Sequence, residues 1–410
     1  MNIDRYEPIV GVPVIGQLRR LGERLKGLNV VHVNSTAEGG GVAEILAWMV
    51  PLMNDLGLDA RWEVITGTSE FFAVTKAFHN GLQGHPVLIK KRDWELYRDV
   101  NRDNFNRLRD ALEGADIVVV HDPQPAPLLE LCGRRRGRWI WRCHIDVSHP
   151  FREVWKGLKP FVERYDASIF SMCQFAQLLS HPQYLIAPSI DPLSEKNIDL
   201  GARELDTVRR RFELDPDVPV LVQISRFDRF KDPVGVIQAY RMVKKMTPVQ
   251  LVLAGGGATD DPEGKEVLDA VLEAADGDPD IHVELLPPAA HRTVNALQRI
   301  ADIVIQKSTR EGFGLTVTEG LWKGKPVIGG DAGGIRMQVV DYHTGFLVMT
   351  PEGAANRIRY LLHHREQGRR MGETGRELVR EHYLLTRHLR EYPTLMYALV
   401  GGKTEHTVMV

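Results

Sequence analysis

Cysteine is scarce in this chain of 410 residues. Its three cysteines, Cys132, Cys143 and Cys173, are odd in number, and none stands in a Cys-x-x-Cys pair. Disulfide frameworks need an even set of cysteines, and structural zinc sites are commonly built from closely spaced pairs. The cysteine content therefore argues against both classes and fits a protein of the reducing cytoplasm.

Long apolar runs and an excess of basic charge are also missing. No run of 18 apolar residues occurs, so we expect no membrane span. Residues 1–27 lack the apolar core of a signal peptide. The net charge of −2 is unlike the basic footprint of most nucleic-acid-binding proteins. We expect a cytoplasmic protein with no membrane or nucleic-acid partner.

Two common nucleotide fingerprints are absent as well. The first apolar run ends before Gly39-Gly40-Gly41, where no Walker lysine follows and the Gly-x-Gly-x-x-Gly spacing is not met. A nicotinamide-dependent oxidoreductase is therefore not expected. No Asp-x-Asp stands at a predicted strand end. We expect no obligatory catalytic metal, although Mg²⁺ can accompany a nucleotide.

Short apolar runs alternate with longer helical patterns along the whole chain. With 43% hydrophobic residues the chain can bury a sizeable core. Nearly apolar strands alternating with helices are typical of parallel sheets covered on both faces. The predicted strands are Val30–Asn34, Ala60–Ile65, Ile117–His121, Trp139–His144, Ala167–Ser171, Tyr184–Pro188, Val220–Ile224, Val249–Ala254, His282–Leu286, Ile303–Gln306, Pro326–Gly329 and Gly345–Val348.

The alternation is broken once, by the proline-containing stretch Ala187–Leu200. We interpret it as a linker between two Rossmann-like, doubly wound α/β domains that face each other across a cleft. The predicted domains span residues 1–190 and 200–380. Residues 381–410 include a helix, about Leu385–Leu399, that we expect to cross back to the first domain. Pro393 predicts a kink or a break in that helix.

Polar residues follow several predicted strands, at the edge where such sheets bind ligands. The glycines 39–41 precede a helix, whose N-terminus favours an anion, although a plain tight turn explains them equally well. Arg226 and Lys231 follow the first strand of the second half and are suited to a diphosphate. The alternative for these two cations is a solvated charged loop.

The stretch Ser308–Gly320, "STREGFGLTVTEG", carries two acids around a glycine loop. Glu311 precedes Gly312-Phe313-Gly314, and Glu319 lies one turn into a predicted helix. Carboxylates here can accept hydrogen bonds from sugar hydroxyls. The alternative is that both acids merely stabilise the positive end of the helix dipole.

Taken together, Arg226, Lys231, Glu311, the glycine loop and Glu319 resemble the retaining glycosyltransferases of family 4, which have the GT-B fold. The stretches "VNSTAEGGGVAEIL", "VHDPQP", "WRCHIDVS" and "APSIDPLSEKN" are similar to the trehalose glycosyltransferring synthases. The resemblance implies a hexosyltransferase that joins glucose from UDP-, ADP- or GDP-glucose to free glucose, forming α,α-trehalose reversibly.

The same resemblance implies a role for each matching residue. Lys231 and Arg226 would hold the diphosphate, Glu319 the ribose and Glu311 the donor glucose. The implied catalytic residues are His144, Glu311, Arg226 and Lys231, and the implied acceptor-binding residues are Asp122 and His144. The implied nucleotide-sugar-binding residues are Gly39, Gly40, Gly41, Arg226, Lys231, Gly312, Phe313, Gly314, Leu315 and Glu319. No metal ligand is implied.

Two departures from the family pattern are visible, and several alternatives stay open. Gly320 stands where many relatives have alanine. Gly333-Gly334 is followed by Ile-Arg-Met-Gln, where the family often has an acid. A retaining trehalose phosphorylase, a sucrose- or sugar-phosphate-forming transferase, and a nucleotide-sugar-binding regulator without activity remain alternatives. The sequence also leaves open the preferred nucleotide base and the favoured direction of the reaction. The oligomeric state is open too, with a homodimer among the options.

Overall fold

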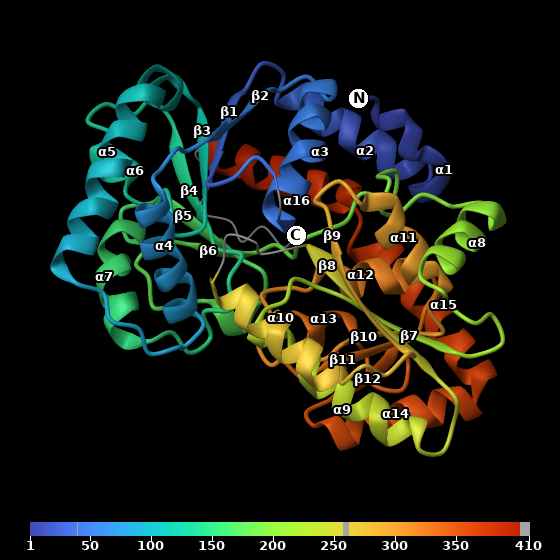
Figure 1. Ribbon diagram of the computed structural model, residues 1–410. Coiled ribbons are helices and arrows are strands. Elements are labelled where there is room, and N and C mark those ends of the chain that lie inside the picture. Colours follow the sequence, from blue (N-terminus) through green and yellow to red (C-terminus); the bar gives the residue numbers. More distant parts are fainter. Residues whose placement is uncertain (39, 257–261, 402–410) are drawn as a thin grey trace. The chain divides into compact units, whose positions relative to one another are not determined.

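The computed structural model describes residues 1–38, 40–256 and 262–401 (Figure 1). The chain divides into two compact units. Unit 1 comprises Met1–Ser189 and Leu385–Val410, and unit 2 comprises Ile190–Leu384. Each unit holds a six-stranded parallel sheet with helices on both faces, which confirms the predicted α/β class.

The sheet of unit 1 has the strand order β2-β1-β3-β4-β5-β6. Helices α2, α3 and α16 pack on one face, and α4, α5, α6 and α7 lie on the other (Figure 1). The elements are η1 (Ile3–Tyr6), α1 (Glu7–Val10), α2 (Val12–Arg24), β1 (Asn29–Asn34), α3 (Gly41–Asp55), β2 (Asp59–Val64), α4 (Ser69–Leu82), α5 (Lys91–Gly114), β3 (Ile117–His121), α6 (Leu128–Leu131), β4 (Arg138–Arg142), α7 (Arg152–Val162), β5 (Ala167–Phe170), η2 (Cys173–Phe175), β6 (Gln183–Leu185) and α16 (Leu385–Val400).

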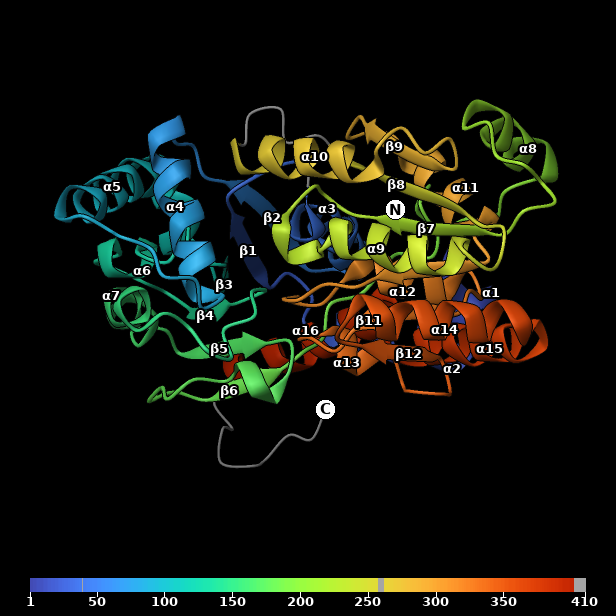
Figure 2. The same cartoon turned by 60° about the horizontal axis from the view of Figure 1, so that its bottom comes forward.

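The sheet of unit 2 has the order β12-β11-β10-β7-β8-β9. Helices α9 and α14 run side by side on one face (Figure 2), and α8, α11, α12 and α15 cover the other. The elements are α8 (Ala202–Arg211), β7 (Val220–Ile224), η3 (Arg229–Lys231), α9 (Pro233–Lys244), β8 (Gln250–Gly256), α10 (Pro262–Ala275), β9 (Ile281–Leu286), α11 (His291–Ile300), β10 (Ile303–Gln306), α12 (Leu315–Trp322), β11 (Val327–Gly330), α13 (Ile335–Gln338), β12 (Gly345–Val348), α14 (Pro351–His363) and α15 (Arg365–His382).

The chain order reverses once in each sheet. In unit 1 the reversal falls between β1 and β3, and in unit 2 it falls between β10 and β7. Connections leaving these neighbouring strands run to opposite faces, so the loops separate and leave a crevice at the carboxyl edge. The predicted site residues follow β1, β3 and β4 in unit 1, and β7 and β10 in unit 2.

The strands carry a few buried polar side chains among their apolar residues. Apolar residues still dominate, because helices cover both faces of each sheet. The buried polar side chains of these strands include His32, Asn34, His121, Arg142, Gln223 and Gln306.

Two predicted boundaries are corrected. Strand β4 ends at Arg142 and not at His144, because the backbone N–H of His144 donates to the side chain of Asp122 and leaves the ladder. Helix α16 continues through Pro393 without a break. Its buried residues lie on both sides of the proline, so tertiary packing supports the helix there. Within the described part of the chain, no helix is long and apolar enough to span a membrane.

Candidate active-site residues

Lys231 and Glu311 meet at the reversal point of the unit 2 sheet. Lys231 ends η3 after β7, and Glu311 lies on the loop after β10. The Lys231 Nζ is 2.5 Å from the Glu311 Oε2, and their side chains are only 19% and 10% exposed. Ser308 Oγ donates to the same carboxylate oxygen at 3.1 Å. Two predicted residues that are 80 positions apart thus form one partly buried ion pair.

A second ion pair holds the same two loops together. Lys307, which is buried, pairs with Asp232 at the start of α9. Asp232 has a left-handed backbone with φ of 49° and also accepts from the Gly235 N–H at 3.1 Å. The Thr309 N–H donates to the Phe230 carbonyl at 2.8 Å. These contacts hold the segment that presents Lys231 rigidly against the one that presents Glu311.

Arg226 is arranged differently from Lys231. Its side chain is 56% exposed, and its Nη2 lies 3.4 Å from Asp228 Oδ2. Because the contact is long and the Arg226 side chain is largely exposed, exchanging it for another contact costs little. Arg226 therefore has the reach and mobility to turn toward an anion at this edge.

The glycine loop 312–314 is held in place by Gln338. Its Nε2 donates to the Phe313 carbonyl at 2.6 Å and to the Gly334 carbonyl at 3.2 Å. Thr318 Oγ1 donates to its Oε1 at 2.5 Å. Gly314 takes a φ of 88°, which glycine adopts without strain, and α12 begins at Leu315. The sequence reasoning missed Gln338, although it had noted the absence of an acid in this very segment.

Glu319 lies inside unit 2 rather than on its surface. Its side chain is 1% exposed and sits on α12. The Oε2 accepts from Gln298 Nε2 at 3.0 Å, and the Oε1 lies 3.9 Å from Lys196 Nζ. Among the described residues the Oε1 makes no hydrogen bond. A buried carboxylate oxygen with spare acceptor capacity is suited to receive a hydroxyl donor.

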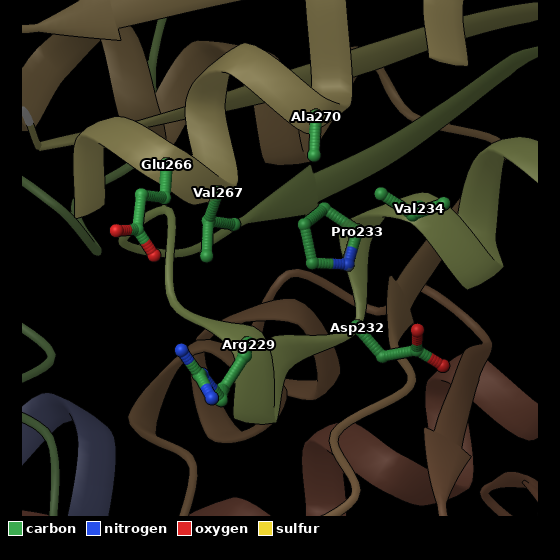
Figure 3. Close-up of a pocket in the computed structure, with 7 residues that line it drawn as sticks. All are labelled: Arg229, Asp232, Pro233, Val234, Glu266, Val267 and Ala270. Carbon is green, nitrogen blue, oxygen red and sulfur yellow. The ribbon is translucent and has the colours of Figure 1, made fainter. Parts of the chain in front are cut away.

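Unit 2 also contains a pocket of about 350 Å³ beside the segment that leads from β7 into α9 (Figure 3). Glu266, Val267 and Ala270 project from α10 toward the segment that carries Arg229 and Asp232 (Figure 3). Among the residues that the structure describes, none of the predicted site residues lines it. The described lining residues are Arg229, Asp232, Pro233, Val234, Glu266, Val267 and Ala270.

In unit 1 the glycine segment leads directly into α3. Gly40 is the residue before the helix and has a φ of 150°, outside the range that other residues prefer. Gly41 is the first residue of α3, and Gly39 lies outside the described residues. Apart from the adjoining residues, no atom in the described part of the chain lies within 4 Å of where a Gly40 Cβ would stand. The backbone N–H groups at this helix start are suited to an anion.

Asp122 and His144 are brought together at the carboxyl edge of unit 1. Asp122 has a left-handed φ of 63°, and its Oδ1 accepts from the His144 backbone N–H at 2.7 Å. Its carbonyl accepts from Trp141 Nε1 at 3.0 Å. Burial raises the pKa of Asp122 to about 6. The two predicted acceptor-binding residues, on the loops after β3 and β4, are therefore joined by a hydrogen bond.

His144 is the end of a chain of three imidazoles. His32 Nδ1 lies 3.0 Å from His121 Nε2, and His121 Nδ1 lies 3.0 Å from His144 Nε2. Burial lowers the pKa of His32 to about 3 and those of His121 and His144 well below the usual value. All three rings are neutral near pH 7. The sequence reasoning missed His32 and His121, although a histidine within an otherwise apolar strand was a usable signal.

A buried cation accompanies this chain. Arg142 is 0% exposed, and its Nη2 donates to Ser171 Oγ at 3.3 Å. Its charge adds to the burial that lowers the pKa values of His121 and His144. It also contributes to the lowered pKa of His388 on α16, which bonds to Ser189 Oγ at 2.8 Å.

No cluster of three or more His, Cys, Asp or Glu side chains suited to a metal ion occurs in the described part of the chain. The expected independence from a catalytic metal stays a prediction.

Two family models match the chain. Residues 32–177 match the N-terminal domain of trehalose synthase, and residues 205–378 match glycosyl transferases group 1. The first match covers the imidazole chain, and the second covers the Lys231–Glu311 pair.

Curated relatives match almost the whole chain. Trehalose synthase of Pyrococcus horikoshii is 46% identical over 98% of this chain and 97% of its own length. Trehalose synthase of Rubrobacter xylanophilus is 44% identical over 97% of this chain and 96% of its own length. Trehalose phosphorylase of Grifola frondosa is more distant, at 31% identity over 86% of this chain and 55% of its own length.

Solved structures show the same fold at low sequence identity. Sucrose-phosphate synthase from Thermosynechococcus elongatus has a TM-score of 0.72 at 17% identity, over 92% of this chain and all of that one. The E. coli trehalose-6-phosphate enzyme solved with UDP-2-fluoro glucose has a TM-score of 0.74 at 11% identity, over 90% and 98% of the two chains. Their shared architecture is the GT-B fold. The near-full-length identity to curated enzymes shows that the chain belongs to the trehalose synthase family of glycosyltransferases.

Proposed function

We propose that this chain transfers the glucosyl group of a nucleotide-diphosphate glucose to free glucose, giving α,α-trehalose in a reversible reaction. Relatives named trehalose synthase, at 46% identity over 98% of the chain, support the product. The geometric observation that carries the proposal is the partly buried Lys231–Glu311 pair at the reversal point of unit 2. A cation and a carboxylate at one strand edge suit a substrate that combines a diphosphate with a sugar.

Lys231 is proposed to bind the donor's diphosphate. Its ammonium has three N–H donors, of which the contact with Glu311 uses one. The remaining donors can bind phosphate oxygens, and the mobile side chain of Arg226 supplies a second cation. Preorganised cations stabilise the negative charge that develops on the phosphate as it departs.

Glu311 and Glu319 are proposed to recognise hydroxyl groups of the donor. The Glu311 carboxylate is held by Lys231 and Ser308, so it is already oriented before substrate arrives. The spare Oε1 acceptor of Glu319 suits a ribose hydroxyl. The segment Gly312–Leu315 would contribute backbone groups to the same donor.

Asp122 and His144 of unit 1 are proposed to bind hydroxyls at the reacting end of the sugars. Gly40 and Gly41 would contribute the N–H groups at the start of α3. The neutral ring of His144 can donate or accept one hydrogen bond through Nδ1, because its Nε2 already contacts His121.

The proposed reaction retains the configuration of the transferred glucose. The bond between the donor's anomeric carbon and the β-phosphate oxygen breaks, and its electron pair leaves with that oxygen. The anomeric oxygen of the acceptor bonds to the same carbon on the same face. The acceptor's proton passes to the departing phosphate oxygen, so no protein nucleophile is needed.

We further propose that no metal is obligatory for this chemistry, since Arg226 and Lys231 would supply two cations at the proposed diphosphate site. Trehalose formation after treatment with EDTA and gel filtration should stay within about twofold of the untreated rate. Mg²⁺ added back serves as the control. A loss of more than about tenfold that Mg²⁺ restores would contradict this part of the proposal.

A product assay tests the proposed function. The protein is mixed with glucose and UDP-, ADP- or GDP-glucose in separate tubes, and anomeric protons are followed by NMR. A parallel tube contains glucose 1-phosphate and glucose. Trehalose from a nucleotide donor alone is expected. Trehalose from glucose 1-phosphate alone would make the enzyme a phosphorylase, and no trehalose from any tube would refute the acceptor.

A further inference from the structure

We propose that His121 and His32 are positioning residues that hold His144 in one tautomer, in which Nε2 accepts from His121 and Nδ1–H donates toward a sugar oxygen. The consequence of this inference for catalysis rests on the proposed role of His144. The inference itself concerns three side chains of unit 1 that two 3.0 Å contacts join into a line.

The two contacts constrain each other through the middle ring. A neutral imidazole has one N–H donor and one lone pair. His121 uses both of its nitrogens, Nε2 toward His32 and Nδ1 toward His144. If His121 donates to one neighbour, it must therefore accept from the other. The protons point the same way along the whole chain, so only two arrangements exist.

The far end of the chain selects between them. His32 is 0% exposed, and its Nε2 has no hydrogen-bond partner among the described residues. In one arrangement this Nε2 would carry a proton with no acceptor. In the other, His32 donates through Nδ1 and leaves only a lone pair at Nε2. Orphaned buried N–H donors are rarer in proteins than under-used acceptors. The favoured direction of donation is therefore His32 to His121 to His144.

The charged groups around the three linked imidazoles keep these rings neutral. Arg142, from β4, is fully buried and disfavours a second positive charge on His121 and His144. From α16, the Tyr392 ring lies 6.2 Å from the His32 ring between centroids, and His388 packs on Tyr392 at 4.8 Å. Asp122, whose carboxylate accepts from the His144 backbone, is the nearby acid. A protonated ring would present two donors to its neighbours and break the one-way chain.

The arrangement also fixes the orientation of the His144 ring. The His121 and His144 rings are stacked, with centroids 5.3 Å apart and planes 16° apart. His32 and His121 show the same 5.3 Å spacing at 31°. Rotating His144 would lose both the stacking contact and the hydrogen bond. A ring that is held in this way presents Nδ1–H without paying for its orientation during the reaction.

The first test is nitrogen-15 NMR of the histidine rings in the wild-type protein. This spectrum distinguishes Nδ1–H from Nε2–H tautomers and needs no variant and no activity. We expect His144 in the Nδ1–H form and His121 likewise. His144 in the Nε2–H form, or a charged ring near neutral pH, would overturn the proposal. The result does not depend on trehalose formation, so it separates this inference from the proposed function.

The second test compares kcat and KM in variants. His121→Leu should lower kcat by about 10- to 100-fold, in the range for groups that orient a functional side chain, with an unchanged Kd for the nucleotide. His121→Asn keeps an N–H donor near the position of Nδ1 and should recover most of the loss. His181→Leu is the matched control. His181 also forms a hydrogen bond inside unit 1, to Ser168 Oγ at 2.6 Å, but it is not one of the three linked imidazoles. A folded His121→Leu variant with kcat within about twofold of wild type would refute the positioning role.

Discussion

At the scale of single residues, burial decides what each predicted side chain can do. Lys231 and Glu311 are largely shielded from water, so their attraction is stronger than that of a surface pair. Arg226 is exposed and exchangeable, and Glu319 is enclosed by protein atoms. The sequence motif does not show how exposed each of these four side chains is. In the structure their exposures differ, so we expect their replacement to have different effects.

Replacing Lys231 should have the largest catalytic effect. Lys231→Ala removes the shielded cation and should lower the rate of trehalose formation by at least about 10²- to 10³-fold, the usual loss for one preorganised stabilising group. Initial rates measured by NMR or coupled assay would check this. Lys245→Ala, at an exposed position of the same unit, is the control. Near-normal turnover in Lys231→Ala would remove the diphosphate role.

Glu319 should affect binding more than turnover. Glu319→Ala deletes the buried carboxylate and should weaken nucleotide binding by about tenfold or more, which is about 1.4 kcal/mol. Isothermal titration calorimetry with UDP, ADP and GDP measures this. Glu319→Gln keeps the side-chain volume and separates loss of charge from loss of packing. An unchanged Kd in the alanine variant would contradict the ribose role.

At the scale of elements, two loops of unit 2 depend on close backbone packing. Gly334 approaches the 312–314 loop so closely that a Cβ on it would stand 2.4 Å from the Phe313 Cα and 2.7 Å from the Gly312 carbonyl oxygen. Its N–H also donates to the Glu311 carbonyl at 3.1 Å. The position of the Glu311 loop is therefore set partly by the absence of a side chain on a different loop.

Gly334→Ala should displace this loop. The added methyl group cannot fit without moving backbone, which typically costs about 1–3 kcal/mol. We expect lower thermal stability and a loss of trehalose-forming activity of at least about tenfold. Thermal melts and initial rates give the two readouts. Gly353→Ala is the control, because its Cβ would meet only ordinary contacts of 3.5 Å or more. A Gly334→Ala protein with normal stability and rates would disprove the packing argument.

Element prediction from the sequence worked where the pattern is local. The apolar runs correspond to the strands of the two sheets, because parallel strands covered on both faces need apolar residues throughout. Ends were less accurate, as the early end of β4 shows. That end depends on a hydrogen bond between His144 and Asp122, which are 22 positions apart, and no window of sequence contains that information.

At the scale of the whole molecule, a group of buried neutral histidines makes unit 1 sensitive to acid. Burial lowers the pKa of His32 to about 3 from 6.5, and those of His121, His144 and His388 are also lowered. The unfolded chain therefore binds more protons than the folded one below pH 6.5. Stability is fully present above that pH and is lost as the pH falls toward 3.

Each of these histidines should make the free energy of unfolding fall by up to about 1.4 kcal/mol for each unit by which the pH is lowered. Asp122 opposes this between about 3.8 and 6, since its raised pKa makes the folded state bind the extra proton there. Urea unfolding followed by fluorescence of the buried Trp139 and Trp141, in a pH series from 8 to 4, measures the sum. We expect a fall in stability beginning near pH 6.5, and a shallower one in His388→Gln. A flat profile between neutral pH and pH 5 would contradict the buried neutral state.

Fold class, strand pattern and family could be predicted from the sequence alone, because apolar periodicity and the residue types around Lys231, Glu311 and Glu319 can be read along the chain. Which distant residues touch is visible only in the folded protein. Examples are the Lys231–Glu311 ion pair, the hydrogen bonds from Gln338 to the glycine loop, and the line of imidazoles that ends at His144. Each forms where the strand order reverses or where loops from different strands meet. Such contacts depend on which carboxyl ends become neighbours in the sheet, and neighbour order is a property of the folded chain.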